Sequence, residues 1–274
     1  MGKLVGFITG YVQTIFIDKA VGQIPTLGWW CIHRSLRGLG LGKLLLGAIE
    51  AQAHQVGCKQ WMTFNQQKPT ERLILNGNQF NTHLMMSIFL NSKKLAKWGL
   101  PGKIEIFKPE GEEYLQTLKK KHYKSAISVL IKYLSKYAIK PTWNEDEFLL
   151  RFAPRKGVIY SYVMEDLNGE VTEFISFTLR HVRNVSKDNE RDARDNILNV
   201  AQLDYYVNNR MSLTELVSQG IAKLKGVDQV IIPQIMDYSN INIKMSVSSI
   251  KSIWCYNGKI KSTDTHEMSL VSLF

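Results

Sequence analysis

The feature that most constrains the fold of this chain is a glycine-rich turn between an apolar run and a helical pattern. The turn reads Arg37-Gly38-Leu39-Gly40-Leu41-Gly42 and follows the run TLGWWCIH at 26–33. Apolar residues then recur at helical spacing over 42–56, and Gly57 ends the pattern. Residues 59–64 have strand-like composition. The order strand, glycine-rich turn, helix, strand predicts a βαβ unit.

Such a turn is suited to bind an anion. Glycine permits left-handed backbone, and successive N–H groups at the start of a helix converge on negative charge. The turn is not a P-loop, because no Gly-Lys-Ser/Thr follows it, and no acidic residue ends the next strand as a Rossmann fingerprint requires. By spacing alone it fits an ordinary strand-to-helix connection equally well.

The net charge of the chain, like the turn, favours binding of an anion. Its 274 residues have a formal net charge of +11, which favours an anionic partner such as nucleic acid, acidic lipid or a phosphorylated small molecule. The three cysteines, Cys31, Cys58 and Cys255, lack the spacing of a disulfide framework or a zinc site. There is no signal-peptide pattern and no apolar run of the ~18 residues that a transmembrane segment needs. We therefore expect a cytoplasmic protein without a transmembrane segment.

Two parts of the chain repeat the same order of elements. Gly6-Phe7-Ile8-Thr9 is similar to Glu173-Phe174-Ile175-Ser176 at an offset of 167, and Gly57-x-x-Gln60 to Gly226-x-x-Gln229 at an offset of 169. Nearly equal offsets indicate an internal duplication with two similar lobes. Lys108-Pro109-Glu110-Gly111 is a strong breaker, so we expect the halves to be 1–108 and 109–274.

The other elements are predicted from periodicity, caps and turns. Strands are expected at 3–9, 12–17, 158–164, 170–178, 200–207 and 228–232, and helices at 112–138, after the capping pair Asn144 and Glu147, and from Ser212 to Lys225. Between 65 and 111, loop signals surround a short apolar segment at 84–90.

Motifs in the chain resemble a known superfamily. Arg-x-x-Gly-x-Gly, present as Arg37, Gly40 and Gly42, resembles the acyl-CoA signature of the GCN5-related N-acetyltransferases (GNAT). Further blocks resemble one family within it, the eukaryotic N-myristoyltransferases. They are KLVGFI at 3–8, WWCIHRSLR at 29–37, and the segments 130–148, 168–177 and 214–228. The blocks follow the family's order and cover almost the whole chain.

The resemblance implies the fold and the reaction. The implied fold is α+β, with two GNAT-like halves related by pseudo-twofold symmetry around a continuous twisted mixed sheet flanked by helices. The first half would bind acyl-CoA, and the second would bind the peptide and supply the C-terminal carboxylate. Myristoyl-CoA would be the cosubstrate, and its acyl group would pass to the α-amine of an N-terminal glycine. The implied protein is a monomer that needs no metal and binds acyl-CoA and glycine-initiated proteins, not nucleic acid.

The resemblance also implies roles for single residues. Backbone N–H groups of Trp29 and Trp30 would stabilise the thioester oxyanion, and the α-carboxylate of the last residue, Phe274, would be the general base. The residues implied in cofactor binding are Trp30, Cys31 and Ile32 along the pantetheine, and Arg37, Gly38, Gly40, Leu41 and Gly42 at the CoA phosphates. Thr63 and Tyr205 match residues that face the peptide.

The chain departs from the family pattern in three places. Leu39 and Gly40 stand where the family has basic residues, and Gln234 stands where it has an acidic one. The family's aromatic segment that clasps CoA, which lies ahead of the block at 3–8, has no counterpart here, so we expect a shortened N-terminus. Two alternatives stay open: a GNAT acetyltransferase that uses a short acyl-CoA, and a catalytically inactive module that binds acyl-CoA or a myristoyl group.

Some polar residues also have a purely structural interpretation. His33 fits a strand end as well as a phosphate contact, and Cys31 is not accompanied by the residues that would make it a nucleophile. The lysines 119, 120, 121 and 124 are typical of a solvated helix face, because no nucleic-acid motif accompanies them.

Overall fold

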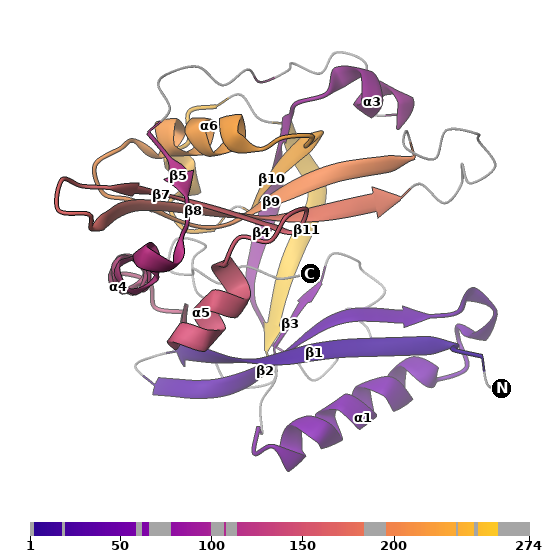
Figure 1. Cartoon of the computed structure of the whole chain (residues 1–274). Helices are drawn as coiled ribbons and strands as arrows, with labels where there is room; N and C mark the ends of the chain where they lie inside the picture. The colour runs from indigo at the N-terminus through magenta and orange to yellow at the C-terminus, as the bar shows by residue number, and fades with distance from the viewer. Residues whose placement is uncertain are drawn as a thin grey trace. The chain divides into compact units, whose positions relative to one another are not determined.

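The structure is a computed structural model of the chain (Figure 1), described for residues 3–17, 20–58, 62–65, 78–99, 107, 114–183, 196–233, 235–243 and 246–256. The chain divides into two compact units. Unit 1 holds Met1–His83, Tyr137–Thr142 and Ile250–Phe274, and unit 2 holds Leu84–Lys136 and Trp143–Ser249. Segments of the two units alternate along the chain. The units therefore do not coincide with the sequence halves 1–108 and 109–274, which stay a prediction.

Unit 1 is built around a long antiparallel strand pair. Its elements are β1 (Gly6–Ile17), β2 (Ala20–Ile32), the 3-10 turn η1 (Arg34–Leu36), α1 (Leu41–Gln55), β3 (Met62–Asn65), β6 (Lys140–Thr142) and the end of β11 (Ser246–Tyr256). β3 is parallel to β2, whereas β11 pairs antiparallel with β3 and β6 pairs antiparallel with β1. The strand order is β11-β3-β2-β1-β6, so helix α1 connects two parallel neighbours.

Helix α1 packs on β1 where β1 has glycines. A Cβ atom on Gly10 would lie 3.1 Å from Cδ1 of Ile49, and one on Gly6 would lie 3.3 Å from Cδ1 of Leu45. The missing side chains allow the helix to approach the strand closely. Figure 1 shows α1 running along this strand pair.

Unit 2 contains a six-stranded mixed sheet and most of the helices. Its strands are β5 (Gln116–Thr117), β7 (Ile159–Glu165), β8 (Val171–Arg183), β9 (Ile197–Asn208), β10 (Gln229–Pro233) and the end of β4 (Asn78–Phe89), in the order β5-β7-β8-β9-β10-β4. β9 and β10 are parallel, and the other pairs are antiparallel. Its helices are α3 (Ser92–Lys97), α4 (Tyr123–Leu134), α5 (Glu145–Phe152) and α6 (Leu213–Lys223), with 3-10 turns η2 (Lys120–His122) and η4 (Tyr238–Asn240).

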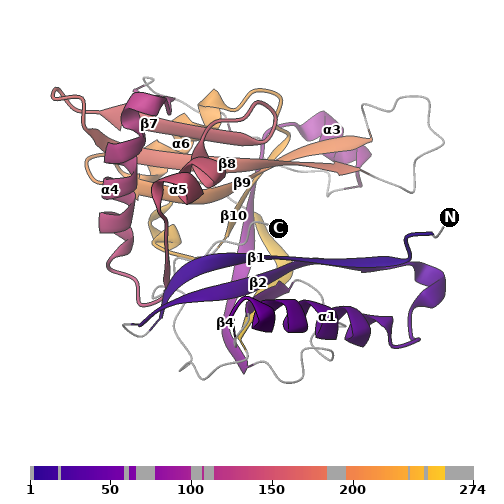
Figure 2. The ribbon, with the colours of Figure 1, turned by 60° about the horizontal axis from the view of Figure 1, so that its bottom comes forward.

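Alternate residues of β8 face different helices. The ring of Phe174 lies 5.4 Å from that of Phe152 on α5, in an edge-to-face contact. Ile175 and Phe177 point to the other face, where they lie against Gly220 of α6. The alternation of a strand thus places α4 and α5 on one face of the sheet and α6 on the other (Figures 1 and 2). This is a mixed sheet flanked by helices, as expected.

The internal repeat predicted from the offsets is confirmed in the topology. Each unit contains an antiparallel strand pair, a helix, and a strand parallel to the second strand of the pair: β1-β2-α1-β3 and β8-β9-α6-β10. Both strand pairs also have a register shift at the matched place, between Ile8 and Gly10 in β1 and between Ser176 and Phe177 in β8. The bulge is therefore part of the repeated unit.

Two sequence predictions were wrong in detail. Of the helix or helix pair expected over 112–138, the described residues hold the 3-10 turn η2 and helix α4, whereas Gln116 and Thr117 pair with β7 as a short strand. Four of the residues with loop signals, Asn78 to Asn81, lie in a strand, since β4 begins at Asn78. In both cases pairing with a distant strand overrides the local preference of the residues. Within the described parts of the chain, no helix is long and apolar enough to cross a membrane.

Candidate functional site

The glycine-rich turn adopts a backbone conformation that only glycine takes readily. Gly38 has φ of +88° and Gly40 has φ of +79°. Gly40 is the residue that caps the N-terminus of α1. No atom lies within 4 Å of a Cβ built on either residue, so the backbone angle and not crowding requires glycine here.

The start of α1 has N–H groups without an acceptor inside the helix. The N–H groups of Lys43 and Leu44 already bond to the carbonyl of Gly40, at 3.0 and 3.3 Å. The N–H groups of Leu41 and Gly42 open the helix, where no carbonyl four residues earlier in the helix can accept them. Arg37 and Lys43 are exposed at its edges. A helix N-terminus with cations beside it is suited to a phosphate or another anion.

Trp29 and Trp30 lie where the pairing of β2 is interrupted. The register of β1 and β2 shifts between Ile8 and Gly10, and β2 has the extra residue of this bulge, next to Trp29. On its other edge β2 pairs, within the described residues, with β3 at residues 26 and 27. A bulge takes backbone groups out of the ladder of hydrogen bonds. The backbone of β2 is thus irregular at the place where the resemblance puts oxyanion donors.

The residues that follow in β2 connect this bulge to the turn. Cys31 is an exposed free thiol and Ile32 is half-buried. His33 caps η1, with Nδ1 2.7 Å from Oγ of Ser35, which fits its structural interpretation. The Nε–H of Arg37 donates to the carbonyl of Ile32 at 3.3 Å, so the arginine folds back on the end of β2. Residues 29–42 therefore form one continuous stretch of strand, turn and helix in unit 1.

The remaining predicted residues lie apart from this stretch in the chain. Thr63 is in β3, where it pairs with Leu27 of β2 and with Cys255 of β11. Tyr205 is in β9 of unit 2 and is only 1% exposed. Its ring packs edge-to-face against Trp143, with 5.2 Å between the ring centres. Phe274 and Gln234 lie outside the described residues.

A buried charged cluster next to Tyr205 was not predicted from the sequence. Asp204 is the extra residue in the bulge of β9 and is 2% exposed. Its Oδ2 accepts a hydrogen bond from Oγ1 of Thr178 at 2.5 Å, whereas Oδ1 has no hydrogen-bond partner within the described residues. The guanidinium of Arg151 lies 5.0 Å from the centre of the Tyr205 ring. The one signal in the sequence was an acidic residue inside the apolar strand VAQLDYYV.

The environment of Asp204 favours its neutral form. Burial raises the pKa of Asp204 to about 6, although the charges of Arg151 and Arg180 and the hydrogen bond from Thr178 act to lower it. An ionised carboxylate with one unpartnered oxygen is costly in such a place.

The turn between β9 and α6 contains its own carboxylate. Glu173 is fully buried, and its carboxylate accepts the N–H groups of Asn209 at 2.8 Å and Arg210 at 2.7 Å. Burial raises the pKa of Glu173, while these donors and the N–H of Met211 act to lower it. The hydroxyl of Ser212 then caps α6. The N–H groups of this turn are thus bonded within the protein.

Within the described parts of the chain, no three His, Cys, Asp or Glu side chains are grouped to hold a metal ion.

Comparison with known proteins first defines the class of the fold. The family model "Acetyltransferase (GNAT) family" matches residues 1–75, which include β1, β2, the glycine-rich turn and α1. The crystal structure of a GCN5-related N-acetyltransferase from Anabaena variabilis superimposes with a TM-score of 0.53, at 13% identity over 91% of this chain and 58% of that one. The chain is therefore a GNAT-fold protein.

A second family model narrows this class. "Myristoyl-CoA:protein N-myristoyltransferase, C-terminal domain" matches residues 94–243, more than half of the chain. The chain belongs to the N-myristoyltransferase family.

Individual relatives agree with this assignment. A protein of Acanthamoeba polyphaga mimivirus is 28% identical over 88% of this chain and 65% of its own length. Glycylpeptide N-tetradecanoyltransferase 2 of Danio rerio is 24% identical over 98% of this chain and 56% of its own length. The structure of Saccharomyces cerevisiae N-myristoyltransferase with bound myristoyl-CoA has a TM-score of 0.83, at 18% identity over 99% of this chain and 74% of that one. The chain thus spans 56–65% of the length of the two curated relatives.

Proposed function

We propose that the chain is an N-myristoyltransferase that moves a 14-carbon acyl group from myristoyl-CoA to the α-amine of an N-terminal glycine. The observation that carries the proposal is the turn at 37–42 in a member of this family. Its two left-handed glycines lead into α1, whose first N–H groups have no acceptor inside the helix, and a helix N-terminus of this kind can bind phosphate groups. The proposal includes the sequence-based expectation of a cytoplasmic monomer.

Unit 1 would bind the cosubstrate. The CoA phosphates would lie against the backbone of Gly38, Gly40, Leu41 and Gly42, with Arg37 as a cation, and the pantetheine would follow β2 along Trp30, Cys31 and Ile32. Three facts support this assignment: the bulge in β2, its short pairing with β3, and its direct continuation into the turn.

The chemistry requires an unprotonated amine. A terminal amine has a pKa of roughly 7.7–8.0 and is mostly ammonium at neutral pH, so a base must remove a proton before attack. We assign this role to the α-carboxylate of Phe274. The amine nitrogen then attacks the thioester carbonyl, and N–H groups of Trp29 and Trp30 stabilise the oxyanion. The C–S bond breaks, and the CoA thiolate leaves and takes the remaining extra proton of the nitrogen. Backbone donors do not depend on side-chain identity, so two tryptophans can occupy these positions.

The peptide would contact Thr63 and Tyr205. Because the Tyr205 ring is buried against Trp143, we expect its effect on peptide binding to come partly through this packing.

The test uses myristoyl-CoA and a glycine-initiated peptide, with mass detection of the acylated product. The peptide should gain one myristoyl group, and a matched peptide that begins with alanine should gain far less. Removal of Phe274 should slow turnover by on the order of 10²–10⁴-fold if its carboxylate is the base. Unchanged turnover in that variant would contradict the base assignment, and absence of any transfer would contradict the enzymatic function.

A second candidate function is a GNAT acetyltransferase that uses a short acyl-CoA. The observation in its favour is the turn itself, where an exposed Leu39 and Gly40 replace the basic residues that the resemblance leads us to expect. Acetyl-CoA that outcompetes myristoyl-CoA as acyl donor would establish this alternative. Tight acyl-CoA binding without turnover would instead identify an inactive binding module.

A further inference from the structure

The turn between β7 and β8 holds a leucine fully in solvent. Leu167, at the tip of this turn, is 106% exposed. The turn is well bonded, since Oδ1 of Asp166 accepts the N–H groups of Asn168 at 2.9 Å and of Glu170 at 3.0 Å. Gly169 completes it with φ of +80°. The leucine is therefore presented by a rigid turn, at a position where polar residues are usual.

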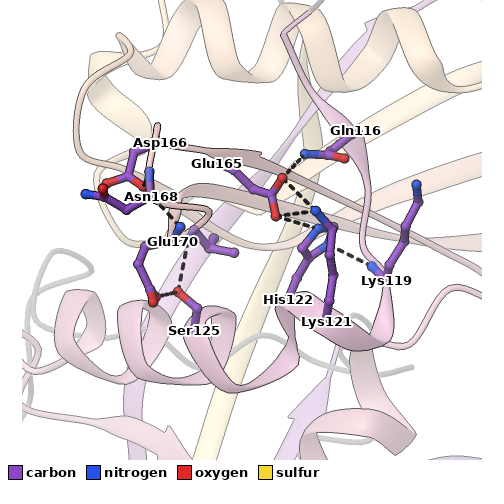
Figure 3. A network of polar contacts seen from close by, with 10 residues as sticks. Gln116, Lys119, Lys121, His122, Ser125, Glu165, Asp166, Asn168 and Glu170 are labelled. Carbon is purple, nitrogen blue, oxygen red and sulfur yellow. Dashed lines mark hydrogen bonds and ion pairs between the residues drawn. The ribbon is translucent and has the colours of Figure 1, made fainter.

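Basic residues of η2 and α4 lie next to this turn. Nζ of Lys121 is 2.8 Å from Oε1 of Glu165 at one end of the turn, and Oγ of Ser125 donates to Glu170 at the other end at 2.6 Å. Figure 3 shows these residues facing one another. Lys120 and Lys124 are exposed on the same segment. Lys121 and Ser125 thus connect η2 and the start of α4 to the two ends of the turn that carries Leu167.

The cationic side chains around this turn are more exposed to solvent than most of its carboxylates. The side chain of Lys121 is 60% exposed, whereas that of its partner Glu165 is 16% exposed. Arg210, 3.6 Å from Asp166, is 59% exposed against 17% for that carboxylate. Glu170 is the exposed acidic residue among those that contact the turn. A flat partner would therefore meet mainly positive charge around an apolar tip.

We propose that Leu167 together with Lys120, Lys121, Lys124 and Arg210, the Leu167 surface, docks on a bilayer that contains anionic lipids. The leucine enters the boundary between headgroups and acyl chains, and the cations contact the lipid phosphates and carboxylates. The net charge of +11 adds long-range attraction to such a membrane. A nucleic acid would fit less well, because these five residues include no aromatic side chain on which bases stack.

The test is cosedimentation with vesicles of phosphatidylcholine, with and without 30% phosphatidylserine. The protein should bind the anionic vesicles, and 0.5 M NaCl should release it. Leu167→Ser should weaken binding about tenfold, since one exposed apolar side chain no longer leaves water. Lys120→Glu with Lys124→Glu should weaken it on the order of a hundredfold.

Matched variants in unit 2 serve as controls. Leu150→Ser removes a leucine that is 70% exposed on α5, and Lys93→Glu with Lys225→Glu makes the same change in net charge on α3 and after α6. Both controls should bind within about threefold of the unsubstituted protein, because surface electrostatics falls off within a Debye length. Thermal unfolding and acyl transfer to a soluble peptide should be unchanged in every variant.

Three results would overturn the proposal. They are no binding of the unsubstituted protein to anionic vesicles, equal losses in the test and control variants, and binding to poly(U) that displaces the vesicles. Because the measurement requires no catalysis, it is independent of the proposed function.

Discussion

The strand-to-helix turns of the two units use their backbone N–H groups in opposite ways. In unit 1 the turn before α1 has two left-handed glycines, and the first N–H groups of the helix have no acceptor inside the helix. In unit 2 the turn before α6 wraps its N–H groups around the carboxylate of Glu173. The internal repeat aligns Glu173 with Gly6. The N–H groups before α6 are thus occupied by an internal anion, whereas we propose that those before α1 bind an external one.

The two bulges differ in a similar way. The bulge of β2 lies beside Trp29, where the proposed oxyanion donors are backbone N–H groups and not side chains. The bulge of β9 contains Asp204, a buried carboxylate held by Thr178. The same backbone bulge is thus a candidate catalytic site in β2 and the place of a buried, hydrogen-bonded carboxylate in β9.

The largest expected effect is on the closed turn of unit 2. Glu173→Ala leaves the N–H groups of Asn209 and Arg210 without their buried acceptor, so the free energy of unfolding should fall by about 2–4 kcal/mol. Urea unfolding at pH 7 measures the loss. Glu145→Ala, at an exposed position of α5, should change stability by less than about 0.5 kcal/mol. Similar small effects for both variants would contradict the internal-anion interpretation.

The next prediction concerns pH and the bulge of β9. Burial raises the pKa of Asp204 from 3.8 to about 6, so between these values the folded state binds a proton that the unfolded state has released. The contribution of this group to stability is therefore largest at low pH and decreases as pH rises through 6, by up to about 3 kcal/mol.

Asp204→Asn should remove this dependence. The stability of the variant relative to the unsubstituted protein should rise between pH 4 and pH 6.5, as measured by urea unfolding at each pH. A difference that stays constant over this range would show that the carboxylate is already ionised in the folded protein.

Substitution of a glycine in the turn before α1 tests the anion-binding role proposed for unit 1. Gly40→Val forces a β-branched residue to φ of +79°, and we expect the affinity for myristoyl-CoA, measured by calorimetry, to fall more than about tenfold. Gly226→Val introduces comparable strain at φ of +71° in the turn after α6. The affinity of the Gly226→Val variant for myristoyl-CoA should stay within about twofold of that of the unsubstituted protein. Equal losses of affinity in both variants would mean that strain, and not the turn's position, determines binding.

The smallest expected effect is on stability, when glycines in α1 and α6 are replaced by alanine. A Cβ on Gly220 would lie 2.9 Å from Cε2 of Phe177, whereas nothing lies within 4 Å of one on Gly47. Gly220→Ala should therefore destabilise the protein by about 1 kcal/mol, after the gain in helix propensity is subtracted from the cost of overpacking. Gly47→Ala should stabilise it by about 0.5–1 kcal/mol. Thermal unfolding distinguishes the two, and a stabilised Gly220→Ala variant would contradict the tight contact.

Local signals determined much of this protein by themselves. The turn at 37–42, helix α1 and the capping pair Asn144 and Glu147 were predicted correctly, because each depends on contacts within a few residues of the chain. The repeat was predicted as well, since a duplicated fold preserves the order of its elements. The roles of Trp29, Trp30, Thr63, Tyr205 and Phe274 came from the resemblance alone and stay predictions.

Only the tertiary structure decided which of the repeated turns and bulges contain a buried carboxylate. The partners of Glu173 lie 36 and 37 positions further along the chain, and the hydroxyl that bonds Asp204 lies 26 positions earlier. β4 and β5 likewise acquire strand structure from distant neighbours, against their local pattern. Periodicity and turn chemistry describe what a segment does on its own, whereas burial and hydrogen bonding depend on which segments the fold brings together.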